Sequence, residues 1–223
     1  QTGLLTGVRR GAPIYSLANG PRFTGRHGTL TNLQFAADGP DYVVSEKFDG
    51  GLKSVFWRVN GNGWLDCNYT YNAEGAKDFL GILFDYPEGQ VKAKRWLGDG
   101  PYRVWKNRML GATFGVWQND YNNTITGWRD WIYPEFKGCF ADVRWLQLQT
   151  TEGQITVAPE NVPFVQVLTP AFPPPKLAGN TIPSLPECGL GFLDIIPPMG
   201  SKFQRAEMVS PSGERSVAHG KYS

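Results

Sequence analysis

The chain has 223 residues, of which 41% are hydrophobic and 19% charged, and its formal net charge is +2. This length is enough to bury a core without structural metals or disulfide bonds. The near balance of charge gives no electrostatic reason to expect nucleic acid as a partner. Without a run of about 18 apolar residues, the sequence predicts no membrane-spanning helix and no membrane as a partner.

Short strands separated by turns are expected along most of the chain. Helical periodicity is almost absent: residues 72–83 could form a short helix, but Gly75 and Gly81 argue against it. The dipeptide Asn60-Gly61 suits a type I′ turn between two strands. The expected strands cover residues 4–9, 41–48, 51–59, 63–71, 89–97, 112–117, 139–150, 154–158 and 164–168.

The Pro-rich segment of residues 170–186 cannot join a central strand ladder and is expected to run along the surface. Too few residues follow it to form a second domain. We therefore expect residues 1–223 to form a single all-β domain, a large antiparallel β-sandwich. The chain begins at Gln1 without an initiator methionine, and a strand is expected to start near its end. We interpret it as a fragment of a longer protein.

The three cysteines are Cys67, Cys139 and Cys188. An odd count with scattered spacing matches neither a disulfide framework nor a zinc site. The pattern favours buried free thiols that behave as small hydrophobic groups. A bridge between Cys67 and Cys139 remains an alternative.

Residues 96–138 contain five tryptophans interleaved with Arg, Lys, Asn and Asp. Sugars present apolar C–H faces and a ring of hydroxyls, which flat aromatic rings and charged hydrogen-bonding groups match. This pattern predicts carbohydrate as a partner, and the alternative is that the rings belong to the core. The candidate carbohydrate-binding residues are Trp105, Lys106, Asn107, Arg108, Trp117, Tyr121, Trp128 and Trp131.

No residue is assigned a catalytic or metal-binding role. Glycoside hydrolysis usually needs two carboxylates about 5–9.5 Å apart, and no acidic residue lies in a context that marks such a pair; Asp99, between two glycines, is typical of a turn. His27 and His219 are far apart in the sequence, which argues against a triad or metal site. No glycine-rich phosphate loop is present, so no cofactor is expected. The other acidic candidates are Asp85, Glu88, Asp120, Asp130, Glu135 and Asp142.

Five stretches carry motifs of a known family. Residues 97–108 are similar to the pattern G-x-G-P-x-E-x-Y-x-D-R, with Asn107 in place of the usual Asp and Trp105 where Tyr is common. The other four are residues 2–8, 19–23, 133–138 and 145–153. The chain thereby resembles the C-terminal region of glycoside hydrolase family 2 enzymes of the β-galactosidase type. In that family this region is a "supersandwich", related to galactose mutarotase, that follows the catalytic barrel.

The resemblance implies a non-catalytic accessory domain, because the family's two catalytic glutamates lie in the barrel. The parent protein is then expected to be a glycoside hydrolase acting on polysaccharide or oligosaccharide, secreted or periplasmic in a bacterium. The catalytic barrel domain of the parent chain is the expected partner, with residues 189–199 as a candidate docking loop or, alternatively, a plain core strand. Two other functions remain open: a carbohydrate-binding module, and a free-standing mutarotase- or lyase-type sandwich enzyme.

Overall fold

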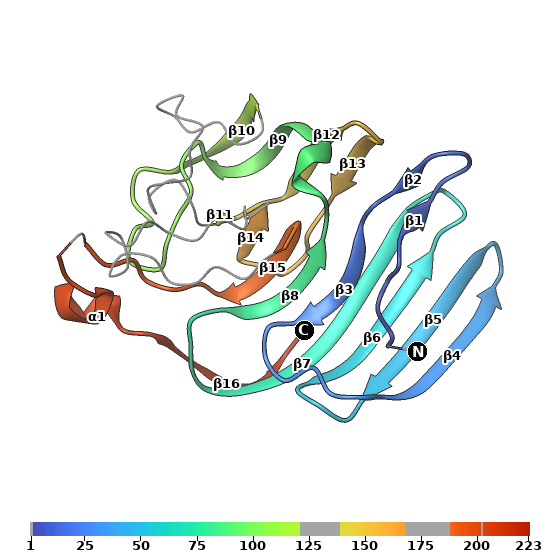
Figure 1. The fold of residues 1–223 in the computed structure, drawn as a ribbon, viewed down its shortest axis with the longest axis horizontal. Coiled ribbons are helices and arrows are strands. Elements are labelled where there is room, and N and C mark those ends of the chain that lie inside the picture. Colours follow the sequence, from blue (N-terminus) through green and yellow to red (C-terminus); the bar gives the residue numbers. More distant parts are fainter. Residues whose placement is uncertain (1, 121–138, 168–187, 202) are drawn as a thin grey trace.

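The computed structural model describes residues 2–120, 139–167, 188–201 and 203–223. Its regular structure is almost entirely antiparallel β-sheet, which confirms the all-β sandwich. Figure 1 shows the strands of a central sheet lying between those of a long sheet and a four-stranded sheet. Besides the strands there are three short helices, η1 (Glu88–Gln90), α1 (Ala206–Val209) and η4 (Pro211–Gly213), in the described residues.

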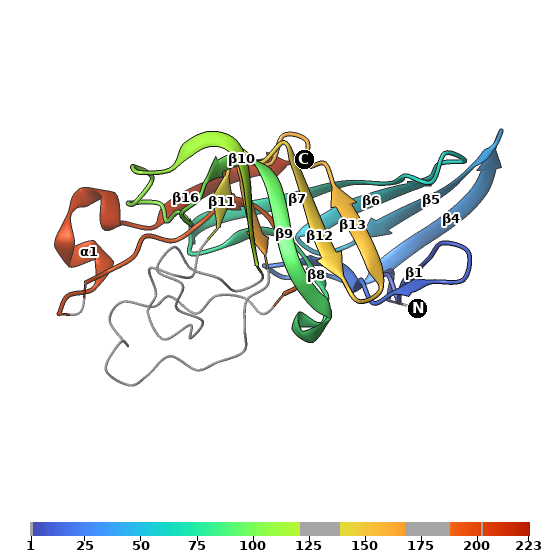
Figure 2. The ribbon, with the colours of Figure 1, turned by 90° about the horizontal axis from the view of Figure 1, so that it is seen from above.

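The long sheet has the strand order β16-β7-β6-β5-β4, with every neighbouring pair antiparallel. Its edge strand β4 and the next strand β5 extend beyond the rest of the molecule (Figures 1 and 2). A turn over residues 60–64 joins β6 to β7, which confirms the predicted hairpin. Its type differs from the predicted type I′, because the positive φ angle lies at Gly63 and not at Asn60 and Gly61. The strands are β4 (Leu30–Asp38), β5 (Asp41–Phe48), β6 (Leu52–Val59), β7 (Leu65–Lys77) and β16 (Ser216–Tyr222).

The central sheet has the order β11-β14-β15-β8-β3. Residues 72–83 form no helix: they belong to the end of β7 and the start of β8, in agreement with the glycine argument. Residues 190–195 form a buried strand of this sheet, so the core-strand alternative holds for this part of the proposed docking loop. The strands are β11 (Phe140–Ala141), β14 (Phe164–Val167), β15 (Leu190–Ile195), β8 (Leu80–Asp85) and β3 (Ala18–Phe23).

The four-stranded sheet has the order β10-β9-β12-β13. Asp99 lies inside β9, opposite Phe114 of β10, so the predicted turn at this residue is wrong. Of the strand predicted at residues 4–9, only residues 8 and 9 form a strand, β1. It pairs with the equally short β2 in an antiparallel hairpin. The strands are β9 (Val91–Gly100), β10 (Thr113–Asp120), β12 (Trp145–Thr150), β13 (Gly153–Val157), β1 (Val8–Arg9) and β2 (Ile14–Tyr15).

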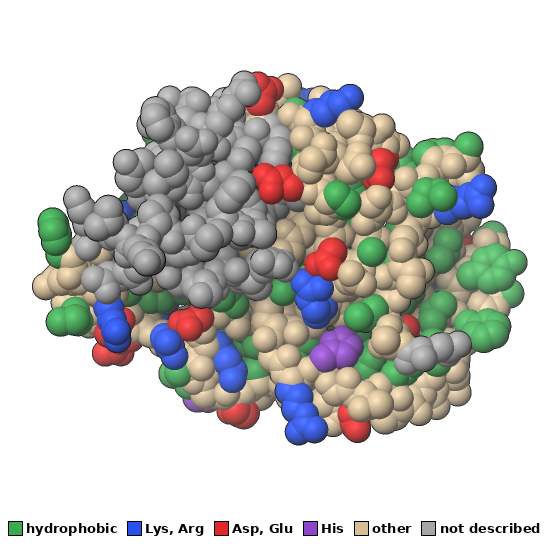
Figure 3. Space-filling model, viewed as in Figure 1, with side chains coloured by type: hydrophobic (Ala, Val, Ile, Leu, Met, Phe, Trp, Pro, Cys, Tyr) green, Lys and Arg blue, Asp and Glu red, His purple; other side chains and the backbone are tan. Residues whose placement is uncertain are grey.

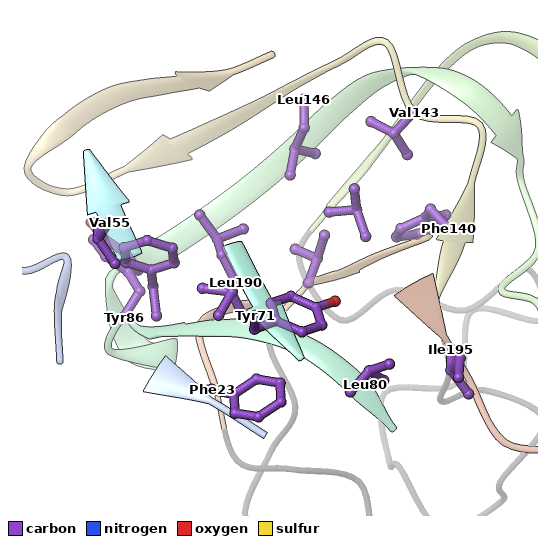
Figure 4. Close-up of a cluster of buried hydrophobic side chains, with 14 of the residues drawn as sticks. Phe23, Val55, Tyr71, Leu80, Tyr86, Phe140, Val143, Leu146, Leu190 and Ile195 are labelled. Carbon is purple, nitrogen blue, oxygen red and sulfur yellow. The ribbon is translucent and has the colours of Figure 1, made fainter. Parts of the chain in front are cut away.

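One hydrophobic core joins all three large sheets (Figure 4). Val55 and Tyr71 come from the long sheet, Leu190 from the central sheet, and Leu146 from the four-stranded sheet. Alternate residues along a strand point to opposite faces, so each sheet gives one face to this core.

Cys67, Cys139 and Cys188 are free thiols, as favoured from the sequence. Among the described residues, no helix is long and apolar enough to cross a membrane.

The close contact between β8 and β15 requires a glycine at position 81. A Cβ atom at this position would lie 2.1 Å from the Phe192 carbonyl oxygen and 2.7 Å from the Leu193 Cα atom. Because both are backbone atoms, Gly81→Ala is expected to lower the free energy of unfolding by at least about 2 kcal/mol. Urea denaturation measures the loss. Gly89→Ala is the matched control: its Cβ would meet nothing within 4 Å, so a comparable loss there would contradict the steric explanation.

Candidate functional site

The segment of residues 105–108, predicted to bind carbohydrate, forms a tight turn. The Trp105 amide donates to the Arg108 carbonyl oxygen at 3.3 Å, and the Arg108 amide donates to the Trp105 carbonyl oxygen at 2.8 Å. The Trp105 side chain is only 2% exposed, and its indole nitrogen has no hydrogen-bond partner within the described chain. Its ring therefore packs in the interior here and offers no face to solvent.

The next two residues of this turn hold the C-terminal part of the chain. The Asn107 side-chain amide donates to the Met199 carbonyl oxygen at 2.9 Å, and its oxygen accepts from the Met199 amide at 2.8 Å. The Lys106 amide donates to the Pro197 carbonyl oxygen at 3.0 Å, and its Nζ atom donates to the Glu214 carbonyl oxygen at 2.5 Å. These bonds anchor the segment after β15, which makes Lys106 and Asn107 structural contacts.

The remaining predicted residues are dispersed. Arg108 is exposed, while Trp117 lies in β10 and is half-buried. The Trp117 indole donates to the Thr113 carbonyl oxygen at 3.2 Å, and its ring lies against Gly100, where a Cβ would approach it to 2.5 Å. Tyr121, Trp128 and Trp131 lie outside the described residues. Carbohydrate binding through this set as a whole stays a prediction.

The acidic candidates are used mainly in local contacts. Burial raises the pKa of Asp85, but hydrogen bonds from Arg22 and Asn19, both at 2.9 Å, outweigh it and hold that pKa below its usual range. Asp142 pairs with Arg144 at 2.6 Å on the surface. Glu88 starts η1 and Asp120 ends β10, while Asp130 and Glu135 lie outside the described residues.

Two buried ionisable groups are not marked in the sequence pattern. Lys94 is 1% exposed on the core side of β9; burial, reinforced by Arg103, lowers its pKa to about 7, and its Nζ atom donates to the Asp120 carbonyl oxygen at 3.5 Å. Glu46 is 6% exposed on β5; burial raises its pKa to about 6, against the opposing effect of a hydrogen bond from Trp57. Period-two alternation with the apolar neighbours is the signal that could have found both.

The long sheet leaves part of its apolar face uncovered. Register places Phe35 opposite Val44, and Val44 opposite the buried Trp57, so Phe35 lies on the core-facing side of the sheet. It is nevertheless 82% exposed. We call this surface the overhang; it consists of Leu33, Phe35, Tyr42 and Val59. Figure 3 shows hydrophobic side chains gathered over this end of the molecule.

The four-stranded sheet presents a second free surface, the face opposite its buried Trp96 and Leu146. Cross-strand pairing puts Leu97 beside both Val116 and Trp145, and Arg95 beside both Gln118 and Gln147. The Arg95 guanidinium carbon lies 5.7 Å from the centre of the Trp145 ring. We call this surface the outer face.

In the part of the chain that the structure describes, no group of three or more His, Cys, Asp or Glu could hold a metal ion.

Comparison with protein families gives a match over most of the described sheets. Residues 28–178 match the family model described as Beta galactosidase small chain. The matched segment begins just before β4 and includes every strand of the four-stranded sheet. No curated protein matches the chain.

Asn107 provides a test of its anchoring role. Asn107→Ala leaves the Met199 amide and carbonyl without their partners, and Met199 is only 2% exposed. We expect a loss of about 1–3 kcal/mol in the free energy of unfolding, measured by urea denaturation. Arg108→Ala, on the exposed neighbour, is the matched control and should stay within about 0.5 kcal/mol. Equal effects of the two variants would contradict the anchoring role.

Glu46 predicts a pH dependence of stability. Its pKa rises from a usual 4.5 to about 6 on folding, so the folded state favours the protonated form. That contribution is complete below pH 4.5 and is lost as pH rises through 6, at a cost of up to about 2 kcal/mol. In urea denaturation, Glu46→Gln should therefore gain stability relative to wild type between pH 4.5 and pH 7. A difference independent of pH would show that Glu46 does not carry this linkage.

Proposed function

The chain belongs to the β-galactosidase small chain family, and from this membership we propose that it is a non-catalytic accessory domain of a glycoside hydrolase. The parent enzyme acts on a polysaccharide or oligosaccharide, and its catalytic part carries the hydrolytic carboxylates. The local engagement of Asp85 and Asp142 supports this division, because both side chains serve ion pairs within the domain.

The observation that carries the proposal is the overhang. Contiguous exposed apolar patches on soluble proteins mark interaction surfaces, and Phe35 and Tyr42 are 82% and 65% exposed on a face that is otherwise core. On the opposite face of β4 stand Asn32, Gln34 and Asp38, which suit water. This division between the two faces supports contact with another folded body on the apolar side only.

The catalytic part of the same enzyme is the occupant that we propose for the overhang. The outer edge of β4 supports this assignment, since the strand has no charged side chain between Leu30 and Ala37. Edge strands exposed in the functional state commonly carry charges or proline that prevent pairing. An edge without them suits a strand that another part of the enzyme covers.

A charge introduced at Phe35 tests the docking. In the isolated chain, Phe35→Glu should change the free energy of unfolding by no more than about 0.5 kcal/mol, since the side chain is already exposed. In the intact enzyme, the same change buries a carboxylate in the contact and should lower stability by about 1–3 kcal/mol. Thermal unfolding of both proteins measures the difference.

Gln34→Glu is the matched control, because it adds the same charge to the opposite face of β4. It should be neutral in both proteins. Equal, small effects of Phe35→Glu in the chain and in the enzyme would mean that the overhang stays uncovered. Hydrolysis of a chromogenic galactoside by the isolated chain would refute the non-catalytic role.

A further inference from the structure

The outer face of the four-stranded sheet has two parallel rows of different chemistry. The core side of this sheet is fixed by Trp96 and Leu146, which face each other across β9 and β12 and are fully buried. The alternating residues must therefore point away from the core. Exposure agrees: Val116 of β10 is 54% exposed, and Arg95 and Gln118 are exposed.

The first row is apolar and crosses three strands. Val116 pairs with Leu97, and Leu97 pairs with Trp145, so the three side chains stand side by side. Phe114, one step further along β10, is 54% exposed and extends this surface. Trp145 and its aliphatic neighbours therefore form an apolar strip on the solvent side of the sheet, with the Arg95 guanidinium carbon 5.7 Å from the centre of the Trp145 ring.

The second row is polar and crosses four strands. Gln118, Arg95, Gln147 and Thr156 are joined by consecutive cross-strand pairs. Neighbouring strands are about 4.8 Å apart, so the row is about 14 Å long, and it runs about 7 Å from the apolar row. The side-chain amides of Gln118 and Gln147 make no hydrogen bond to any other part of the chain that the structure describes. Their donors and acceptors therefore remain available to a ligand.

An apolar strip beside uncommitted amides complements a neutral sugar chain. The C–H face of a pyranose stacks on aromatic and aliphatic groups, while its hydroxyls both donate and accept hydrogen bonds. A glutamine amide does the same with two donors and an acceptor. A protein partner would instead favour a more continuous apolar surface, like the overhang, and an anion would require more than the single cation of Arg95 in this row.

We propose that the outer face binds a neutral oligosaccharide segment across β10, β9, β12 and β13, with Trp145 stacking on a sugar ring and Gln147 bonding its hydroxyls. This inference rests on the proposed function, since an accessory domain with such a face holds polysaccharide near the catalytic part. Figure 2 shows β9, β12 and β13 side by side, away from β4 and β5. The sugar-binding face and the overhang therefore lie on different sheets.

Isothermal titration of the full 223-residue chain with soluble β-1,4-galactan, a neutral polysaccharide, tests the proposal. We expect saturable binding of galactan. Gln147→Ala should weaken binding about 2- to 10-fold by removing one hydrogen-bonding group. Trp145→Ala should weaken it further, and thermal unfolding checks that this half-buried substitution leaves the chain folded.

The control is Gln34→Ala, which removes an exposed glutamine from β4 on the long sheet and should leave binding unchanged. No heat of binding with galactan would overturn the proposal, as would equal weakening by Gln34→Ala and Gln147→Ala. Either result leaves the docking of the overhang untouched, since that is measured separately by the stability of the Phe35 variant. Binding of an acidic polysaccharide but not galactan would also overturn it, in favour of a site built on Arg95.

Discussion

The whole arrangement depends on which side of β9 faces the core. Trp96 is fully buried, donates its indole N–H to the Asp99 carbonyl oxygen at 3.1 Å, and packs on Phe140 with ring centroids 4.4 Å apart. Because side chains alternate along a strand, a slip of one residue would exchange the two faces of the sheet. The position of Trp96 therefore fixes the outer face, with Arg95 and Leu97, as firmly as it fixes the core.

The glycines of β9 explain why the C-terminal end of this strand is hard to recognise in the sequence, where the expected strand stops at residue 97. Gly98 and Gly100 flank Asp99 in a pattern that is typical of a turn. In the structure they lie on the core side, where a Cβ at Gly98 would meet the Val143 Cα at 2.9 Å and one at Gly100 would meet the Trp117 ring at 2.5 Å. Glycine here leaves room for Val143 beside Gly98 and for the Trp117 ring of the neighbouring strand beside Gly100. Sequence alone cannot separate that use from a turn, since Val143 and Trp117 lie elsewhere in the sequence.

Strands with clear alternation could be predicted, whereas those without it could not. β5 and β6 lie where β-branched and aromatic residues alternate, and the turn at Asn60-Gly61 fixes their neighbour β7. β4 was missed because its sequence, Leu30–Asp38, combines weak strand formers with an apolar side that the domain leaves exposed.

The hydrogen bonds between Asn107 and Met199 join residues 92 positions apart. Nothing local in the sequence marks such a contact, so the anchoring role of Asn107 could not be predicted from the sequence.

Aromatic content likewise does not say which rings face solvent. Trp57, Trp96 and Trp105 are buried in this domain, whereas Trp64 is 48% exposed. For Trp57 and Trp96 the register of the strand places the ring in the interior, while Trp64 and Trp105 lie in turns, so the density of tryptophan does not predict exposure. Register gives the two free surfaces their different character: an aromatic and aliphatic overhang on β4 to β6, and apolar and amide rows on the outer face.

Because both faces are fixed by one core, a core substitution would alter them together, whereas substitution on one face leaves the other intact. The two proposed roles can therefore be separated experimentally within a single domain.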